Sequence, residues 1–225
     1  MAPIRIQPET DLAVVIDVQP TFMPGGALPV ADGHAVVPVI NRLLRSFRHA
    51  AASQDWHPAD HLSFASQHGK QPGEMVELHY GPQLLWPDHG VAGTAEAELH
   101  EDLDQSRIAI VIRKGMRRDV DSYSAFVEAD RQTETGFAAW VLARGFRRLF
   151  FMGLAFDFCV ADSALSAAAL RRPDGQPLEV FVVEDACRSV AIPLGEGRDT
   201  AASARQRMEA AGIRLISAAE IDGAA

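Results

Sequence analysis

Cysteine is nearly absent from this sequence, which has only Cys159 and Cys187 among its 225 residues. Two cysteines are too few for the disulfide framework that small extracellular domains use for stability. Both are therefore expected to be reduced thiols in a reducing compartment. This favours a cytoplasmic protein.

Long hydrophobic runs and an excess of basic residues are also missing. No stretch approaches the roughly 18 consecutive apolar residues of a membrane span, and residues 1–10 lack a basic segment followed by an apolar one. Lys and Arg number 21 against 30 Asp and Glu, which gives a formal net charge of −9. The basic residues occur in small groups rather than in one stripe. We therefore expect neither a membrane nor a nucleic acid as a partner.

The apolar content of 48% suffices for one sizeable core, so a single domain over residues 1–225 is expected. Short runs rich in Val, Ile and Leu predict strands at 12–16, 108–112, 149–152, 180–183 and 213–216. Helical patterns lie between them at 34–47, 134–144, 160–170 and 199–211. Residues 50–54 are either a further strand or an extension of the preceding helix. The alternation indicates an α/β fold with a mainly parallel sheet of up to six strands.

Four polar residues come just after predicted strands: Asp17, Asp55, Lys114 and Cys159. Ligands of open α/β sheets bind at the carboxyl ends of the strands, so these four side chains are expected to converge although they are distant in sequence. Residues 56–93 show no clear period, and loops of that length in compact domains are usually functional. Any one of the four could be an ordinary loop residue, but together they predict a site.

Cys159 is the candidate nucleophile because it begins a predicted helix. The amino terminus of a helix is expected to lower the pKa of the thiol and to hold a developing oxyanion. Cys187 follows two acids, Glu184 and Asp185, which oppose thiolate formation, so it is interpreted as a structural residue. Asp17 can act as the base for the thiol.

A second group is formed by Asp55, His57 and His89. One carboxylate and two imidazoles leave coordination positions open, which is typical of catalytic Zn, Fe or Mn. The spacing alone is compatible with hydrogen-bonded loop histidines instead. Rival ligands are His61, which could supplement or replace His89, together with His68 and Asp88.

Five separated segments carry a family resemblance: 17–22, 55–58, 86–89, 114–115 with 121–126, and 153–160. With them the chain closely resembles the nicotinamidase/pyrazinamidase branch of the isochorismatase-like cysteine hydrolases, over about residues 11–216. The resemblance implies a three-layer open sheet with helices on both faces. It implies hydrolysis of nicotinamide or pyrazinamide with Asp17 as base, Lys114 as electrostatic partner and Cys159 as nucleophile.

The same resemblance assigns further roles. Asp55, His57 and His89 would hold one divalent metal ion, zinc before iron or manganese. The amides of Ala155 and Cys159 would form an oxyanion hole, next to a cis peptide bond between Leu154 and Ala155. The residues expected to contact the substrate are Phe22, Trp86, Tyr123 and Leu154. Relatives of this kind are commonly homo-oligomers, so the resemblance also implies self-association.

Three other readings stay open. A sister hydrolase of the same fold, acting on a carbamoyl compound or ureidoacrylate, would share the Asp, Lys and Cys but lack the metal residues. An isochorismatase would not use a cysteine nucleophile, and a silent interaction protein would have no reason to keep all six residues. Phe156 and Gly90 depart from the family pattern and could reshape the pocket. Asp162 is expected to face away from the thiol, because a carboxylate facing it would raise its pKa.

Overall fold

The computed structural model describes residues 3–222, so the first two and last three residues of the predicted domain lie outside the described part. A six-stranded sheet with the order β10-β7-β6-β1-β2-β5 forms its centre, and all neighbouring pairs are parallel. The strands are β1 (Asp11–Ile16), β2 (Ala50–Asp55), β5 (Ile108–Lys114), β6 (Arg148–Leu154), β7 (Glu179–Arg188) and β10 (Arg214–Ile216). The predicted strands are confirmed, and residues 50–55 form a strand rather than an extension of a helix.

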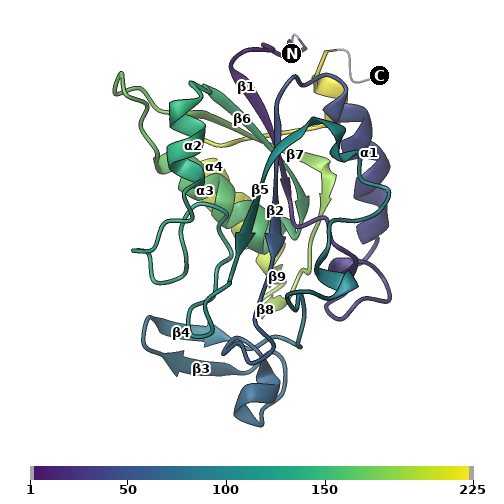
Figure 1. Ribbon diagram of the computed structural model, residues 1–225, viewed down its shortest axis with the longest axis vertical. Helices are drawn as coiled ribbons and strands as arrows, with labels where there is room; N and C mark the ends of the chain where they lie inside the picture. Colours follow the sequence, from purple (N-terminus) through teal and green to yellow (C-terminus); the bar gives the residue numbers. More distant parts are fainter. Residues whose placement is uncertain (1–2, 223–225) are drawn as a thin grey trace.

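Helices cover both faces of this sheet (Figure 1). Helix α1 (Val36–Leu44) lies on one face, and α2 (Phe137–Ala143), α3 (Ala161–Ala169) and α4 (Thr200–Ala210) lie on the other. Glycines with positive φ, Gly145 and Gly212, follow α2 and α4 closely, as the sequence predicted. Each helix is shorter than predicted; the turn η2 (Gly33–Ala35) precedes α1, and strand β9 (Arg198–Asp199) directly precedes α4. The three-layer arrangement is confirmed.

Strand β1 explains why both faces are apolar. Successive side chains of a strand point to opposite faces, and every residue of β1 is buried. Ala13 and Val15 join the core cluster with α1, whereas Val14 and Ile16 join the cluster with α2, α3 and α4. A continuous apolar run is therefore required here.

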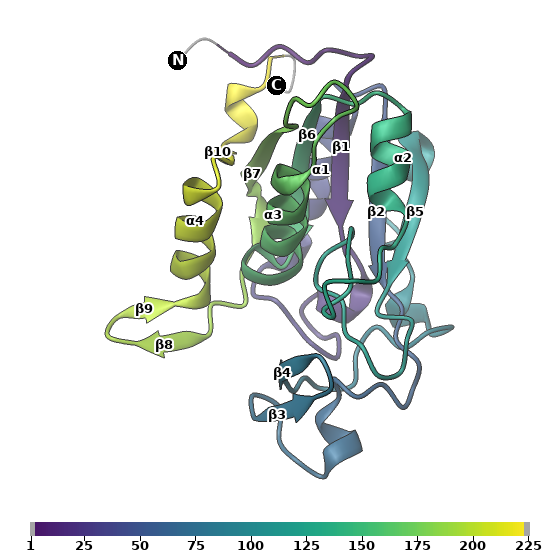
Figure 2. The same cartoon turned by 90° about the vertical axis from the view of Figure 1, so that its left-hand side faces the viewer.

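Two antiparallel hairpins lie beyond the carboxyl ends of the strands (Figure 2). One pairs β3 (Met75–Leu78) with β4 (Gly81–Leu84), and the other pairs β8 (Pro193–Gly195) with β9 (Arg198–Asp199). Neither hairpin was predicted from the sequence, because these strands are short and largely exposed and so lack an apolar pattern. Short helical turns complete the chain: η1 (Pro20–Phe22), η2 (Gly33–Ala35), η3 (Ala65–His68), η4 (Ala95–Ala97), η5 (Gln105–Arg107), η6 (Phe156–Val160) and η7 (Ala218–Glu220).

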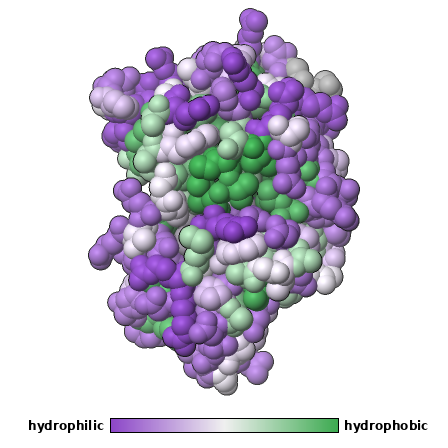
Figure 3. Space-filling view, viewed as in Figure 1, coloured by the Kyte–Doolittle hydropathy of each residue, from purple (hydrophilic) through white to green (hydrophobic). Residues whose placement is uncertain are grey.

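The edge strand β5 leaves apolar side chains at the surface. Figure 3 shows these side chains gathered over β5, between α1 and α2, and Val111 of this strand is 40% exposed. Among the described residues, no helix is both long enough and apolar enough to cross a bilayer.

Candidate active site

The carboxyl ends of three adjacent strands place three of the predicted site residues. Asp17 directly follows β1, Asp55 ends β2 and Lys114 ends β5, where Asp55 and Lys114 are paired in the sheet register. Cys159 lies in the π-helical turn η6, which leads from β6 into α3. All four side chains are buried. The structure therefore brings together the four residues that the strand pattern selected.

Lys114 is the centre of this group. Its Nζ lies 2.9 Å from Oδ2 of Asp17 and 3.4 Å from Sγ of Cys159, and it forms an ion pair with Oδ1 of Asp55. It also donates a hydrogen bond of 2.9 Å to the carbonyl of Ser122. Burial lowers the pKa of Lys114, but the two carboxylates outweigh burial and raise this pKa well above its ordinary value. Lys114 is therefore a fixed cation between the base and the nucleophile.

Asp17 is held in an unusual backbone conformation, with φ of 47°. Non-glycine residues rarely adopt this left-handed region, and aspartate is among those that tolerate it. Ser53 Oγ donates a 2.6 Å hydrogen bond to Oδ1 of Asp17. Burial raises the pKa of Asp17 although Lys114 opposes this. A carboxylate with a raised pKa can both accept and return a proton near neutral pH.

The thiol of Cys159 is not activated as expected. The sequence predicted a lowered pKa at the start of a helix, but burial raises the pKa of Cys159, and the charges of Asp17 and Asp55 raise it further. Lys114 opposes these effects without reversing them. The resting group is therefore a thiol that needs a base. Donor atoms of Asp17, Asp55 and Cys159 lie within 4.8 Å of one another, so a base is close by.

The turn that carries the nucleophile begins at a cis peptide bond between Leu154 and Ala155, as the resemblance implied. Within the turn, the amides of Phe158 and Val160 both donate to the carbonyl of Ala155, at 3.1 Å each. Ala155 and Cys159 both line the same pocket.

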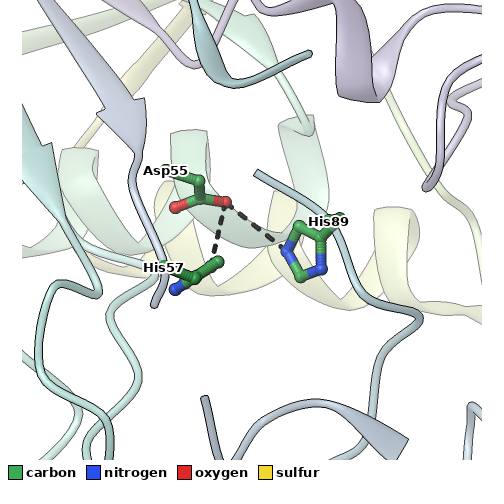
Figure 4. Close-up of side chains that lie close together, drawn as sticks. All are labelled: Asp55, His57 and His89. Atoms are coloured by element: carbon green, nitrogen blue, oxygen red, sulfur yellow. Dashed lines mark ion pairs between the residues drawn. The ribbon is translucent and has the colours of Figure 1, made fainter. Parts of the chain in front are cut away.

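Asp55, His57 and His89 form the second group (Figure 4). Nε2 of His57 lies 3.8 Å and Nε2 of His89 lies 3.7 Å from Oδ2 of Asp55. Nδ1 of His57 is 2.9 Å from the carbonyl of Gly115, and Nδ1 of His89 is 2.7 Å from the carbonyl of Pro87. A carbonyl only accepts, so each Nδ1 donates a proton to its carbonyl, and this bond orients each ring with Nε2 facing Oδ2 of Asp55. This donor set fits a divalent metal ion.

The rival ligands are bound elsewhere. His61 contacts Ser63 Oγ at 2.7 Å and the carbonyl of Val120 at 3.2 Å, and it groups with His57 and Asp121 rather than with Asp55. Burial, with the charge of His57, lowers the pKa of His61 to about 4. His68 binds the carbonyl of Leu62, and Asp88 accepts from Ser66. His68 and Asp88 are thus bound away from the Asp55 group, whereas His61 packs beside His57, with ring centroids 4.4 Å apart, without joining Asp55 and His89.

An apolar pocket opens onto both groups. Its lining residues are Phe22, Leu28, Asp55, Trp86, His89, Asp121, Tyr123, Ala155, Phe158, Cys159 and Val190. Three of the predicted contact residues are therefore in place, and Nε1 of Trp86 donates a 2.8 Å hydrogen bond to the hydroxyl of Tyr123. The fourth predicted contact residue, Leu154, does not line the pocket, because it is completely buried in the core beside β1.

Four lining residues were not predicted from the sequence: Leu28, Asp121, Phe158 and Val190. Phe158 could have been found from its place next to Cys159. In the structure the centroid of its ring lies 5.0 Å from that of Trp86. Leu28 and Val190 lie in loops without a periodic pattern. No local signal in the sequence marks them.

The side chains of Phe156 and Asp162 both lie outside the pocket. Phe156 packs beneath the guanidinium of Arg205, 5.7 Å from its ring centroid, and lines a separate surface hollow. It therefore does not reshape the substrate pocket, in contrast to what the sequence suggested. Asp162 binds Arg207 at 2.6 Å on the outer side of α3, so its predicted orientation away from the thiol is confirmed.

Comparison with known proteins decides the family. The family model for the isochorismatase domain matches residues 11–220. This chain belongs to the isochorismatase family. Curated relatives within this family include a nicotinamidase of Acinetobacter baylyi, 43% identical over 98% of this chain and 99% of that protein. A nicotinamidase of Escherichia coli is 42% identical over 92% of this chain and 94% of its own length.

Several solved structures are similar to this chain in both fold and sequence. The nicotinamidase/pyrazinamidase of Acinetobacter baumanii has a TM-score of 0.87 and 43% identity, over 94% of this chain and 98% of that one. The L. infantum protein PnC1, solved in complex with nicotinate, has a TM-score of 0.80 and 34% identity over 97% and 98%. The pyrazinamidase of Pyrococcus horikoshii, solved in complex with zinc, has a TM-score of 0.70 and 29% identity over 92% and 98%.

Proposed function

We propose that this protein hydrolyses nicotinamide to nicotinate and ammonia, as a step of NAD salvage, and that pyrazinamide is a second substrate. The observation that carries the proposal is that one apolar pocket is lined at once by Cys159 and by Asp55 and His89. A flat heteroaromatic amide has a ring nitrogen at one end and a carboxamide at the other. It can therefore meet both groups together.

The aromatic lining orients such a ring. Trp86 and Phe158 meet edge to face with centroids 5.0 Å apart, and Phe22 lies edge to face with His89 at 5.7 Å. Aromatic walls of this kind favour a planar ring over an aliphatic amide of the same size. Holding the carboxamide beside Cys159 supplies much of the rate through positioning.

The reaction begins when Sγ of Cys159 attacks the carboxamide carbon while Asp17 removes the thiol proton. The carbonyl oxygen becomes an oxyanion, which the amides of Ala155 and Cys159 stabilise, and Lys114 offsets the negative charge that develops near the sulfur. Asp17 then returns the proton to the amide nitrogen. The C–N bond breaks, ammonia leaves, and a thioester to Cys159 remains.

Hydrolysis of the thioester uses the same residues. Asp17 takes a proton from a water molecule, whose oxygen attacks the thioester carbon. The C–S bond breaks, Sγ regains a proton from Asp17, and nicotinate is released. The raised pKa of Asp17 suits this repeated transfer, because a carboxylate of ordinary pKa would hold the proton too weakly.

We propose that Asp55, His57 and His89 hold a divalent metal ion, with zinc as the first candidate. When bound, it supplies a Lewis acid that orients the substrate's ring nitrogen and ordered water. His57 and His89 are held for this by backbone carbonyls at Nδ1. A cytoplasmic location and self-association remain predictions.

The test is product analysis with nicotinamide, pyrazinamide and ureidoacrylate, run on protein as purified, after chelation, and after zinc is restored. We expect acid and ammonia from the two heteroaromatic amides, loss on chelation and recovery with zinc. Turnover of ureidoacrylate alone, unaffected by chelation, would reject both the substrate and the metal role.

A further inference from the structure

Asp157 is a buried carboxylate that the catalytic steps do not use. It lies two residues before Cys159 in η6 and is 5% exposed. Within residues 3–222 it forms no ion pair with Lys, Arg or His. Burying a charge without a counter-charge is costly unless several hydrogen bonds compensate for it. The partners of Asp157 therefore indicate what it is for.

These partners all belong to the segment after β7. Oδ1 of Asp157 accepts from the amide of Val190 at 3.0 Å, and Oδ2 accepts from the amide of Ala191 at 2.8 Å. Thr200 Oγ1 donates to Oδ2 at 2.5 Å. Ala191 has φ of 57°, in the left-handed region, and two successive amides of this segment donate to the same carboxylate.

Thr200 closes the loop of contacts. Its Oγ1 accepts from the amide of Ile192 at 2.9 Å, and its own amide donates to the carbonyl of Ile192 at 3.0 Å. The hairpin β8–β9 lies between these two residues and projects from the body of the molecule (Figure 2). Residues 190–192 are thus fixed to the nucleophile's turn through Asp157, and not through the exposed hairpin.

Val190 connects this network to the substrate. Val190 lines the pocket that Cys159 lines and is half-buried, as are Leu28, Tyr123 and Phe158, whereas Phe22, Trp86 and Ala155 of the same pocket are buried. A half-buried lining residue stands at the rim, where it limits what can enter beside the aromatic walls. Val190 lies outside every strand and helix, and its side chain packs against the core cluster that contains Phe22 and Ala155. The hydrogen bonds to its own amide and to that of Ala191 fix the backbone that carries this side chain.

We propose that Val190 is a specificity-determining residue at the rim of the substrate pocket and that Asp157 is the positioning residue that holds it there. Asp157 acts through the backbone of Val190 and Ala191 and touches no reacting atom. This inference rests on the proposed amide hydrolysis for its substrates, but the rim itself can be tested without turnover.

The first test compares nicotinamide with its four ring-methylated derivatives. Val190→Ala is expected to raise kcat/KM for at least one methylated substrate, relative to nicotinamide, by roughly tenfold, the effect of one methyl group in a fitted pocket. The asparagine in Asp157→Asn has one acceptor oxygen in place of two, so it cannot accept from the amides of both Val190 and Ala191. This variant is therefore also expected to raise kcat/KM for a methylated substrate relative to nicotinamide. It should raise KM for nicotinamide several-fold and leave kcat within about twofold.

Two variants guard this test. Thr200→Val replaces Asp157→Asn if that variant does not fold. It removes one hydrogen-bond donor to the carboxylate of Asp157 and leaves the carboxylate in place, so it should change the order of kcat/KM among the substrates in the same direction but by less. Asp162→Asn removes a carboxylate on the outer side of the adjoining helix, held by Arg207, and should leave the ranking unchanged. Equal ranking in Val190→Ala and wild type, or a fall in kcat with unchanged KM in Asp157→Asn, would overturn the proposal.

The second test uses the rate at which Cys159 is alkylated by N-phenylmaleimide relative to iodoacetamide. Val190→Ala and Asp157→Asn are expected to raise this ratio several-fold, because the bulkier reagent passes the rim more easily. An unchanged ratio would contradict the rim. If no pyridine amide were hydrolysed but the ratio still rose, the proposed function would fail and the rim would stand.

Discussion

The imidazole of His57 lies directly against the backbone of Gly115. A methyl group on Gly115 would lie 2.3 Å from Cε1 and 2.4 Å from Nδ1 of that ring, and φ at this position is +64°. Gly115→Ala is therefore expected to push His57 out of the metal-binding group. We predict a loss of at least tenfold in metal affinity and a comparable loss of activity, measured by metal titration and ammonia release.

Gly69→Ala is the matched control for this substitution. Gly69 has a similar φ of +61°, but no atom lies within 4 Å of the added methyl group. Gly69→Ala therefore places alanine in the same left-handed backbone conformation as Gly115→Ala, but without a clash between the methyl group and a neighbouring side chain. If both variants lost metal affinity equally, the cause would be backbone strain and not the displacement of His57.

Gln19 should matter for the same group although it touches no ligand side chain. Its Oε1 accepts from the amide of Asp55 at 2.8 Å, and its Nε2 donates to the carbonyl of Asp55 at 3.0 Å. Gln19→Leu removes both bonds and should weaken metal binding by about 10- to 100-fold. Gln67→Leu, at an exposed position, should leave the affinity unchanged in the same titration; an unchanged affinity in Gln19→Leu would contradict this role.

Lys114 should contribute to stability as well as to catalysis. Lys114→Met leaves the buried carboxylates of Asp17 and Asp55 facing each other without a cation. Removing one partner from a buried charge group typically costs about 3 to 5 kcal/mol of unfolding free energy. Urea unfolding at pH 7 should show such a loss, and ammonia release should fall to background.

Arg118 provides the contrast. It pairs with Asp60 at 2.7 Å at the surface, where both side chains are more than half exposed. Solvent screens such pairs, so Arg118→Met should change the unfolding free energy by less than about 1 kcal/mol. Equal losses in the two variants would mean that burial does not set the energetics of the Lys114 group.

Cys187 is expected to make stability fall at alkaline pH. Burial, assisted by Glu184 and Asp185, raises the pKa of this thiol to about 12 from an ordinary value of 9.0. The folded state therefore holds the proton more tightly than the unfolded state. The resulting stability is complete below pH 9 and is lost as pH rises from 9 towards 12, by about 1.4 kcal/mol per pH unit.

Comparing wild type with Cys187→Ala between pH 8 and 11 isolates this effect. The stability advantage of wild type should shrink across that range, because alanine does not titrate. Parallel stability curves would show that Cys187 has an ordinary pKa in the fold.

The sheet could be predicted from the sequence because burial on both faces requires continuous apolar runs. The run at β1 shows this, and so does the placement of Asp17 and Lys114 at strand ends. Residues 50–55 could not be assigned, since alanine is compatible with a helix as well as with a buried strand. The hairpins β3–β4 and β8–β9 are exposed and short, so their pairing leaves no pattern.

The site was predictable in its members but not in all its properties. Polar residues after strands located Asp17, Asp55 and Lys114, but the pKa of Cys159 depends on burial and on carboxylates that are distant in sequence. The cis peptide bond followed from family resemblance alone. Val190 was missed because its position depends on Asp157, a contact across 33 residues of sequence.

Ammonia release from nicotinamide, by wild type, Cys159→Ala and Cys187→Ala side by side, tests the central claim most directly. Of the two cysteines, only Cys159 lines the pocket, and its Sγ lies 3.4 Å from Nζ of Lys114. We predict turnover by wild type and Cys187→Ala, and none above background by Cys159→Ala. Sustained turnover by Cys159→Ala would contradict the thioester route.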